Sequence, residues 1–390
     1  MKVLVVLPFF YPHYGGTQRY AEEIFSSMMD QHKDVSVDIL CYNTDKAPKF
    51  ELYRNFNVHR IPCWNILPGR FALPNPIALV KKLSDLSKNK YDFVNTHVRF
   101  FDPCWWVWLY AKKIGAKSIF TGHVPAHPIH QNKLVEILAR GVDLTLAKWS
   151  LKRYDIITFA NKSAQAFFRK TLGIKKDSEV IYIGVNTEEF SPQQKLLPFT
   201  IPNTNSVVDE NHLAVTYLGR IIWTKGVDIF FNAAAEIAKI NDKALFIIAG
   251  SGELERSLRS KCQKLELGGK IIFTGSLNYE QVKSLLGHTH IFVNPSHHNE
   301  GLPNTLLEAG SSGCCVIATN NGATNELIEE GKTGYLIPSK DKDTLKNDIL
   351  DAMNNNDKRL NFGENLRDKI EKGFDWKVSS EKLYNLLLKI

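Results

Sequence analysis

The stretch "LAVTYLGRIIWTKGVDIFFNAAAEIAKINDKALFIIAG", residues 213–250, decides the fold of this 390-residue chain. Its two ends, "LAVTYLG" and "ALFIIAG", are short apolar runs without strict alternation, which is typical of strands buried on both faces. Between them, "VDIFFNAAAEIAKI" has the length and composition of a helix. A strand, a helix and a second strand in this order predict a right-handed crossover between parallel strands.

The same alternation runs through the chain in two series. One extends from "KVLVVLPFF" to "EVIYIG", and the other from residue 213 to "DTLKNDILDAMNN". Residues 191–212 interrupt the rhythm with three prolines and polar filler, as an interdomain linker would. We therefore predict an α/β protein of two doubly wound, Rossmann-like domains, residues 1–190 and 213–375. An amphipathic helix at about 376–390 is expected to pack back on the first domain.

Composition indicates an ordinary globular protein whose charge is unevenly shared. The chain is 44% apolar and 23% charged. Residues 1–195 carry 27 Lys and Arg against 17 Asp and Glu, a net charge of +10, whereas the remainder has a net charge of −2. A basic half favours an anionic partner such as phospholipid, a phosphorylated acceptor or nucleic acid, although a solvated basic surface explains it equally well.

The cysteines and the N-terminus indicate a protein of a reducing compartment that does not cross a bilayer. The six cysteines form no C-x-x-C pair, so we interpret them as small buried side chains. Pro8 and Pro12 follow the first apolar run, and no small-residue cleavage site is present. No run reaches the roughly 18 apolar residues of a membrane span.

Glycines and cations follow several predicted strands, where ligands of open parallel sheets bind. Gly15 and Gly16 separate the first strand from the first helix, and Gly250 follows "ALFIIA", so backbone N–H groups can approach an anion there. Arg220 and Lys225 stand in the loop after "LAVTYL", where a planar fork and a point charge suit a diphosphate. Taken alone, a solvated basic loop is the simpler explanation. No G-x-G-x-x-G fingerprint supports a dehydrogenase.

Two glutamates flank a predicted helix start in "NEGLPNTLLEAG", residues 299–310. Pro303 suits the first helical turn, so Glu300 lies ahead of the positive end of the helix and Glu308 lies inside it. On its own, this pattern fits a favourable charge at a helix N-terminus and a solvated helix residue just as well as a binding site.

Histidines end two other predicted strands. His123 follows "SIFTG" and His97 ends "VNTH", which makes both candidates for a polar site, although a lone histidine is more often structural. Metal binding is disfavoured because the adjacent His297 and His298 would diverge and no H-E-x-x-H occurs. A serine hydrolase is disfavoured because no G-x-S-x-G elbow occurs.

In combination, these features resemble the retaining glycosyltransferases of family 4. The chain order is Gly15-Gly16, His123, Arg220 with Lys225, Gly250, and Glu300 with Glu308. The resemblance covers nearly the whole chain and is strongest in "LGRIIWTKGVD", "EGLPNTLLEAGSSGCCVIATNNGATNELI" and "GKTGYLIP". It implies the GT-B fold, in which two Rossmann-like domains face a cleft. It also implies transfer of a hexose or N-acetylhexosamine from a UDP- or GDP-linked sugar to a glycan or lipid-linked acceptor, as in cell-surface polysaccharide or glycolipid synthesis.

The resemblance implies roles for individual residues. Glu300 and His123 would contact the donor sugar, and Glu308 would hold the ribose hydroxyls. Arg220 and Lys225 would neutralise the leaving diphosphate, so that neither a metal nor a cofactor is expected. The implied catalytic residues are Glu300, His123, Arg220 and Lys225. The implied donor-binding residues are Gly15, Gly16, Arg220, Lys225, Gly250, Gly275, Ser276, Glu300, Gly301, Leu302, Pro303, Asn304, Thr305 and Glu308.

Other functions fit the same fold. A nucleotide-sugar epimerase or a phosphorylase would share it, and so would a non-catalytic protein that binds nucleotide sugars. An anionic membrane surface is a further expected partner, whereas nucleic acid is not. Arg140, Lys148, Lys152 and Arg153 accompany the apolar run "LVEILARGVDLTLAKWSLKR", although a helix packed in the core explains that run equally well. The expected location is the cytoplasm, at the inner face of the cytoplasmic membrane.

Overall fold

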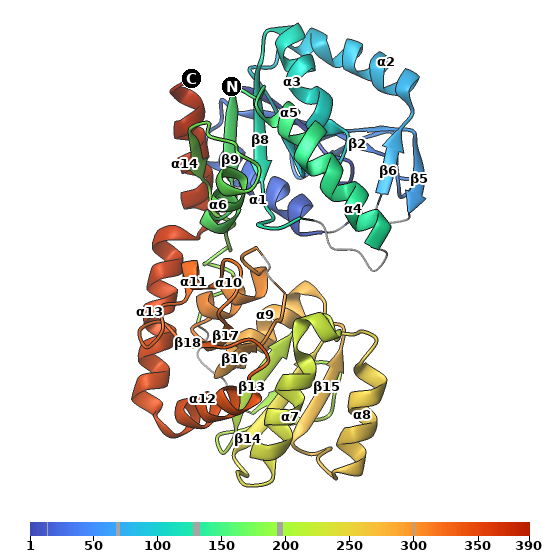
Figure 1. The fold of residues 1–390 in the computed structure, drawn as a ribbon. Helices are drawn as coiled ribbons and strands as arrows, with labels where there is room; N and C mark the ends of the chain where they lie inside the picture. The colour runs from blue at the N-terminus through green and yellow to red at the C-terminus, as the bar shows by residue number, and fades with distance from the viewer. Residues whose placement is uncertain (14, 68–70, 128–132, 193–197, 299–300) are drawn as a thin grey trace. The chain divides into compact units, whose positions relative to one another are not determined.

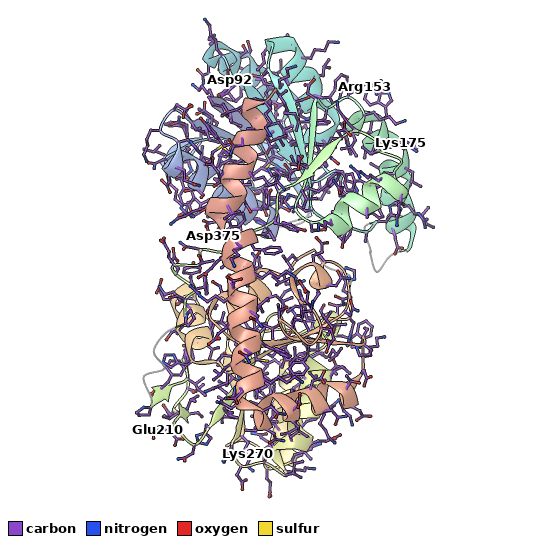
Figure 2. The ribbon with its side chains drawn as sticks, turned by 90° about the vertical axis from the view of Figure 1, so that its left-hand side faces the viewer. Asp92, Arg153, Lys175, Glu210, Lys270 and Asp375 are labelled. Carbon is purple, nitrogen blue, oxygen red and sulfur yellow. The ribbon has the colours of Figure 1, made fainter. Side chains whose placement is uncertain are left out.

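The computed structural model describes residues 1–13, 15–67, 71–127, 133–192, 198–298 and 301–390 (Figure 1). The chain forms two units. Unit 1 comprises Met1–Ile183 and Trp376–Ile390, and unit 2 comprises Gly184–Asp375, whose last residue is labelled in Figure 2.

A mostly parallel sheet forms the centre of unit 1. Its eight described strands have the order β10-β9-β8-β7-β1-β2-β4-β3, in which β3 runs antiparallel to β4. The strands are β1 (Lys2–Val6), β2 (Ser36–Tyr42), β3 (Phe50–Tyr53), β4 (Phe56–Ile61), β7 (Phe93–His97), β8 (Lys117–Gly122), β9 (Ile156–Phe159) and β10 (Ser178–Val180). The helices are α1 (Gly16–Gln31), α2 (Pro76–Leu86), α3 (Pro103–Ile114), α4 (Lys133–Val142), α5 (Lys148–Leu151), α6 (Lys162–Lys170) and α14 (Trp376–Leu388).

Burial on both faces explains the apolar runs of unit 1. Ile119 and Phe120 are neighbours in β8 that point to opposite faces of the sheet, and both are buried. A hairpin of β5 (Cys63–Leu67) and β6 (Phe71–Pro74) adds a separate two-stranded sheet that the sequence pattern does not predict. Helix α14 packs on α1, where Gln31 Nε2 donates to Ser380 Oγ at 2.6 Å.

The sheet of unit 2 is parallel throughout. Its described strands have the order β15-β14-β13-β16-β17-β18, which is that of doubly wound dinucleotide-binding domains. The strands are β13 (Leu213–Leu218), β14 (Ala244–Ala249), β15 (Ile271–Gly275), β16 (Ile291–Asn294), β17 (Cys315–Thr319) and β18 (Tyr335–Ile337). The helices are α7 (Val227–Ala238), α8 (Glu255–Lys264), α9 (Tyr279–His288), α10 (Asn304–Ser311), α11 (Thr324–Leu327), α12 (Lys342–Asn354) and α13 (Asn356–Gly373).

Strand β14 shows why this sheet needs helices on both sides. Phe246 and Ile248 join a buried cluster that includes Phe230 of α7. The alternate residues of the strand, such as Ile247, join a second buried cluster that includes Leu285 of α9. The continuous apolar run of β14 therefore reflects two cores, one on each face.

The boundary between the units lies earlier than the sequence predicts. The chain divides between Ile183 and Gly184, not after residue 190. The expected linker, residues 191–212, contributes the paired strands β11 (Phe199–Thr200) and β12 (Val207–Val208) to unit 2. Ile201 and Val208 are fully buried there. Burial of these two side chains ties the proline-rich segment to unit 2.

A helical stretch of unit 1 is anchored by a buried ion pair. Helix α4, the π-helical segment η2 (Asp143–Ala147) and α5 follow one another without a break. Asp143 is fully buried, and its carboxylate accepts hydrogen bonds from Arg99 Nε at 2.6 Å and from His127 Nδ1 at 2.8 Å. In the described part of the chain, neither this stretch nor any other helix is long and apolar enough to cross a membrane.

Replacing Asp143 tests this anchor. We expect Asp143→Ala to lower the free energy of unfolding by about 3–5 kcal/mol, because it leaves the buried Arg99 guanidinium without its counter-ion. Urea unfolding monitored by circular dichroism measures the change. Glu136→Ala, on the same helix but half-buried, is the control and should change stability by less than about 1 kcal/mol. Equal stability of the two variants would contradict the proposed anchor.

Candidate active site

The strand order of unit 2 reverses between β13 and β16, and ligands of such sheets bind beside the carboxyl ends of the two strands at this point. Arg220 and Lys225 lie in the loop after β13. The segment that leads from β16 into α10 carries Gly301 and the residues that follow it. The loops with the predicted donor-binding residues therefore flank one switch point. Glu300 lies outside the described residues.

The loop after β13 is fixed by its own backbone. Gly219 N donates to the carbonyl oxygen of Ala249 at 3.0 Å, and Ile221 N donates to that of Ser251 at 2.8 Å. The Tyr217 hydroxyl donates to the carbonyl oxygen of Arg220 at 2.7 Å. These bonds hold the backbone of Arg220 while its side chain stays exposed. Lys225 is half-buried at the end of the short helix η3 (Trp223–Lys225).

Two glycines let neighbouring loops of this edge approach closely. Gly250 has φ 130° and Gly226 has φ 68°, values that other residues rarely adopt. A Cβ atom on Gly250 would overlap the carbonyl oxygen of Gly219, and one on Gly226 would overlap that of Pro295. The loops after β13, β14 and β16 therefore pack backbone against backbone. The sequence predicts a glycine turn at Gly250 but does not reveal this packing.

The loop after β16 rests on η3. His297 N donates to the carbonyl oxygen of Thr224 at 2.9 Å, and Ser296 Oγ donates to the same oxygen at 3.2 Å. The His297 ring lies against Trp223, with 5.5 Å between ring centroids. Burial lowers the pKa of His297, and Asp228, 3.9 Å away, partly opposes that shift. His297 is thus a packing residue that couples the loop after β16 to the loop carrying Lys225.

Helix α10 begins at Asn304, with Pro303 just before it as the N-cap residue. Within the described ranges, Oδ1 of Asn304 is buried without a hydrogen-bond partner. Glu308, one turn further on, is only 5% exposed and is therefore not a solvated helix residue. Leu302 is buried, and Gly301 and Thr305 are half-buried. A buried carbonyl oxygen and a buried carboxyl group at the start of one helix are features of a polar binding site.

The end of β15 joins the same edge. Gly250 N donates to the carbonyl oxygen of Gly275 at 2.8 Å, and the hydroxyl oxygens of Ser251 and Ser276 lie 2.8 Å apart. Asn203 Nδ2 lies 3.3 Å from the carbonyl oxygens of Thr274 and Ser276. The sequence did not single out Asn203, because the segment containing it reads as a linker. Its only signal is the turn-forming "PNTN".

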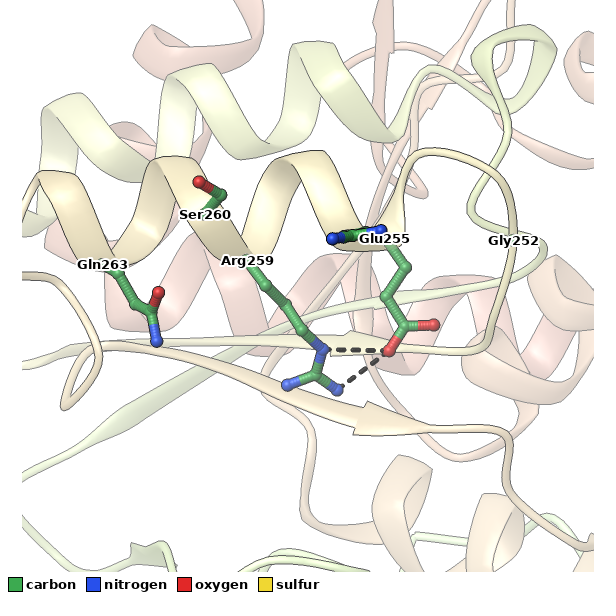
Figure 3. Close-up of a pocket in the computed structure, with 6 residues that line it drawn as sticks. Gly252, Glu255, Arg259, Ser260 and Gln263 are labelled. Carbon is green, nitrogen blue, oxygen red and sulfur yellow. Dashed lines mark hydrogen bonds and ion pairs between the residues drawn. The ribbon is translucent and has the colours of Figure 1, made fainter.

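A groove of about 520 Å³ runs along α8 next to this edge (Figure 3). Its lining residues are Gly252, Glu255, Arg256, Arg259, Ser260 and Gln263. Figure 3 shows Arg259 and Glu255 turned toward each other, and their ion pair measures 2.9 Å. This polar groove begins at the glycine turn after β14, and no sequence pattern predicts it.

Unit 1 has its own switch point, between β1 and β7. His97 ends β7, and His123 follows the adjacent β8. Nδ1 of His97 and Nε2 of His123 are 2.9 Å apart, so one nitrogen donates a proton and the other accepts it. The buried Tyr20 ring lies edge-on to His123, with 4.8 Å between centroids. The pair that the sequence suggested as two separate candidates is thus one hydrogen-bonded unit.

Burial keeps both histidines neutral. It lowers the pKa of His97 well below its usual value, and the neighbouring His123 adds to that shift. Burial also lowers the pKa of His123 to about 4. Two imidazolium rings cannot share one hydrogen bond, because each would need a proton at the shared position. The pair therefore presents a hydrogen-bonding group without charge.

The remaining predicted residues of unit 1 lie at the N-terminus of α1. Gly15 is the N-cap residue in an extended conformation, and Gly16 is the first helical residue. Both are exposed, and a Cβ atom on Gly16 would meet nothing within 4 Å. Packing within unit 1 therefore does not require a glycine at position 16. A glycine at position 16 would allow an anionic ligand to approach the N-terminus of α1 closely.

Two family models match the chain, one on each unit. The model described as glycosyl transferases group 1 matches residues 203–369, and the model described as glycosyltransferase family 4 matches residues 14–189. The chain belongs to the group 1 glycosyltransferases. The predicted GT-B fold of two Rossmann-like domains is confirmed by solved structures that match the full length of this chain, among them a glycosyltransferase of Rickettsia africae.

Relatives of this glycosyltransferase span its whole length. An uncharacterized glycosyltransferase of Methanocaldococcus jannaschii is 26% identical over 96% of this chain and 95% of its own. A GDP-mannose-dependent monoacylated alpha-(1-6)-phosphatidylinositol monomannoside mannosyltransferase of Corynebacterium glutamicum is 24% identical over 99% of this chain and 97% of its own. Among solved structures, Anabaena HepE in complex with UDP matches with a TM-score of 0.76 and 15% identity over the full length of both chains.

The neutral histidine pair makes stability depend on pH. Between pH 6.5 and about 4, an unfolded histidine holds a proton that folded His123 does not, so stability falls as the pH drops through this window. We expect a loss of about 1 kcal/mol per pH unit from His123, measured by urea unfolding at pH 7.5 and 5.0. His123→Asn should reduce the loss, whereas His298→Asn, at an exposed position, should not. The same pH dependence in all three proteins would contradict the assignment.

Proposed function

We propose that the protein is a retaining glycosyltransferase that moves a hexose or N-acetylhexosamine from a nucleotide-diphosphate sugar to a glycan or lipid-linked acceptor. The product would enter cell-surface polysaccharide or glycolipid synthesis. One observation carries the proposal: Arg220 and Lys225 follow β13, and the buried Glu308 lies in the helix after β16, so two cations and a carboxyl group flank one switch point.

The chemistry of a nucleotide-sugar donor matches these groups. A diphosphate leaving group gains negative charge as its bond to the sugar breaks, and Arg220 and Lys225 supply fixed positive charge for it. A carboxylate accepts hydrogen bonds from two adjacent hydroxyls, which suits Glu308 for the ribose. Anabaena HepE, which has the same fold, binds UDP, and the Corynebacterium relative depends on GDP-mannose. These two proteins support a nucleoside diphosphate sugar as the donor, but they do not indicate whether its base is uracil or guanine.

The proposed step breaks the bond between the anomeric carbon and the diphosphate oxygen. The acceptor oxygen bonds to the anomeric carbon on the face that the leaving group departs from, and the acceptor proton passes to the departing phosphate oxygen. Glu300 and the neutral His123 are proposed to hold the donor sugar hydroxyls. Gly15 and Gly16, at the N-terminus of α1, are proposed to approach the phosphates.

We propose that neither a metal nor a cofactor takes part, since the two cations perform the task that a divalent ion performs in other transferases. In the described part of the chain, no three His, Cys, Asp or Glu side chains gather in a metal-binding group. If the proposal is right, activity survives dialysis against EDTA unchanged. Activity that is lost with EDTA and restored by Mg²⁺ or Mn²⁺ would contradict it.

We propose a lipid-linked acceptor ahead of a free glycan, and a place of action in the cytoplasm at an anionic membrane surface. The basic charge of the first half of the chain supports an acceptor that carries phosphate. The Corynebacterium relative is named for a phosphatidylinositol acceptor, which agrees with this choice. The cysteines fit a reducing compartment, because Cys41, Cys104, Cys262, Cys314 and Cys315 are buried thiols.

Variants of the cation pair test the proposed function. Purified protein is incubated with UDP-glucose, UDP-galactose, UDP-N-acetylglucosamine or GDP-mannose, with and without polyprenyl-linked or phospholipid acceptors, and release of nucleoside diphosphate is measured. We expect acceptor-dependent release from one donor, and a decrease in kcat of about 100- to 1,000-fold in Lys225→Ala, because the charge acts on the transition state. Lys243→Ala, at an exposed position of unit 2, should keep wild-type kcat.

Product analysis separates the alternatives. Conversion of the nucleotide sugar without any acceptor would indicate an epimerase. Binding of a nucleotide sugar without turnover of any donor would indicate a binding protein. Either result overturns the transferase proposal.

A second variant separates donor binding from chemistry. Glu308→Gln should raise the KM for the donor by about tenfold and change kcat little, because the ribose lies away from the bond that breaks. Initial rates over a range of donor concentrations measure both constants. Glu364→Gln, at an exposed position of α13, is the control. A large decrease in kcat with unchanged KM would contradict a ribose-binding role.

A further inference from the structure

The stretch from residue 136 to 153 presents its apolar side chains outward. Ile137 is 66% exposed, Leu138 62% and Trp149 46%, and Leu144 and Leu146 are also exposed. We call these five residues the outer apolar surface. Three of the four fully buried side chains of this stretch are small or polar, namely Asp143, Ala147 and Ser150, and the fourth is Leu151 near its end. A helix of a globular domain normally has the opposite arrangement, with its apolar stripe toward the core.

Specific polar contacts fix this orientation. The Asp143 carboxylate accepts hydrogen bonds from Arg99 and His127, and Ser150 Oγ donates to the carbonyl oxygen of Cys104 at 2.6 Å. Arg99 is buried as well, so rotating the helix to bury its leucines would separate a buried ion pair. The outer apolar surface is therefore built into the fold. Large exposed apolar side chains gathered on one short helical stretch mark an interaction site.

Basic groups border this surface. Arg140, Lys152 and Arg153 are exposed, and Lys148 is half-buried, whereas Glu136 is the one acidic residue of the stretch besides the paired Asp143. The Arg153 guanidinium lies 3.6 Å from the centroid of the Trp149 ring, and Figure 2 shows Arg153 at the periphery of unit 1. Helix α3, which contacts α5, adds the exposed Lys112 and Lys113. Aliphatic side chains with tryptophan and cations at their border match the interfacial region of an anionic bilayer.

Charge disfavours a second copy of this chain as the occupant. In a two-fold symmetric dimer the same patch meets itself, so that Arg140 and Lys152 would face a second set of cations. An acidic headgroup layer has the complementary sign and also accepts the aliphatic side chains beneath it.

We propose that the outer apolar surface lies in the interfacial region of an anionic membrane and holds unit 1 on it. The stretch 136–153 then lies in the membrane plane, with the outer apolar surface below the headgroups and Arg140, Lys152 and Arg153 among the phosphates. This goes beyond the proposed function by naming the residues that meet the bilayer. The membrane proposal rests on the proposed function in one respect: a lipid-linked acceptor explains why the protein would bind a membrane.

Vesicle flotation tests the proposal. The full-length protein is mixed with vesicles of phosphatidylcholine alone or of phosphatidylcholine with phosphatidylglycerol, and the fraction that floats is measured at low and high salt. We expect flotation with the anionic vesicles only, decreasing with salt. Ile137→Ser combined with Leu144→Ser should lower the partition coefficient by about tenfold or more, and so should Arg140→Gln combined with Lys152→Gln.

A matched control uses exposed apolar residues of unit 2. Ile240 is 71% exposed and Leu360 51%. Ile240→Ser combined with Leu360→Ser removes as much exposed apolar surface and should float as the wild type does. Equal flotation of this control and of the Ile137/Leu144 variant, either both retained or both lost, would overturn the proposal. Failure of the wild type to float with anionic vesicles would also overturn it.

Brominated lipids give an independent measurement. Lipid-borne bromine quenches tryptophan that enters the bilayer, so the wild type should be quenched more strongly than Trp149→Phe. Equal quenching in both proteins would show that Trp149 does not enter the bilayer.

Light scattering tests the alternative of a dimer. If Ile137→Ser with Leu144→Ser converted a dimer to a monomer while flotation was unchanged, the surface would be a dimer interface.

Nucleotide binding and vesicle flotation test the proposed function and the membrane proposal separately. Binding of UDP and GDP, measured by calorimetry without vesicles, should be unchanged in all surface variants, because none of these residues lies at a strand end of either sheet. Flotation without nucleotide binding would defeat the proposed function and leave the membrane surface intact. Nucleotide binding without flotation would do the reverse.

Discussion

Parallel strands carry all of their carboxyl ends to one edge of the sheet, and this constraint determines where the chain can build a site. In unit 2 the strand order reverses between β13 and β16, which opens a gap between the loops that follow them. Close backbone packing at Gly226 and Gly250 then draws the neighbouring loops together. Arg220, Lys225 and Glu308 are far apart in the sequence, but each follows a strand whose carboxyl end lies at the same edge of the sheet.

Charge is distributed differently in the two units. Unit 2 offers an exposed arginine and a half-buried lysine for a group that carries negative charge. Unit 1 offers a histidine pair that burial keeps uncharged, so it can select hydroxyls without attracting phosphate. A sugar nucleotide combines both kinds of group, with an anionic diphosphate between two polyols. The proposed donor would thus find a group of matching chemical character in each unit.

Local patterns in the sequence predicted much of this, and long-range contacts account for what they missed. Buried strands such as β13 and β14 are visible as apolar runs because both of their faces are covered. The linker was misassigned because the burial of Ile201 and Val208 in unit 2 has no signature in a proline-rich stretch. The boundary was placed too late because Val185 and Phe190 bond to Phe374 and Ser311, which are far away in the sequence. The sequence also did not show that the helical stretch 136–153 presents its apolar side chains outward. The cause of this orientation, Asp143, is paired with Arg99, 44 residues away in the sequence.

Unit 1 is made of two separate pieces of chain, Met1–Ile183 and Trp376–Ile390. The second piece completes the first, since Trp376 lies against Tyr20 with 5.7 Å between ring centroids and α14 packs along α1. During synthesis the ribosome therefore releases all of unit 2, Gly184–Asp375, before it releases the helix that unit 1 lacks. In unit 1, one side of α1 therefore stays uncovered until α14 has been made. Unit 1 therefore begins to form first but is completed only after the whole chain has been made.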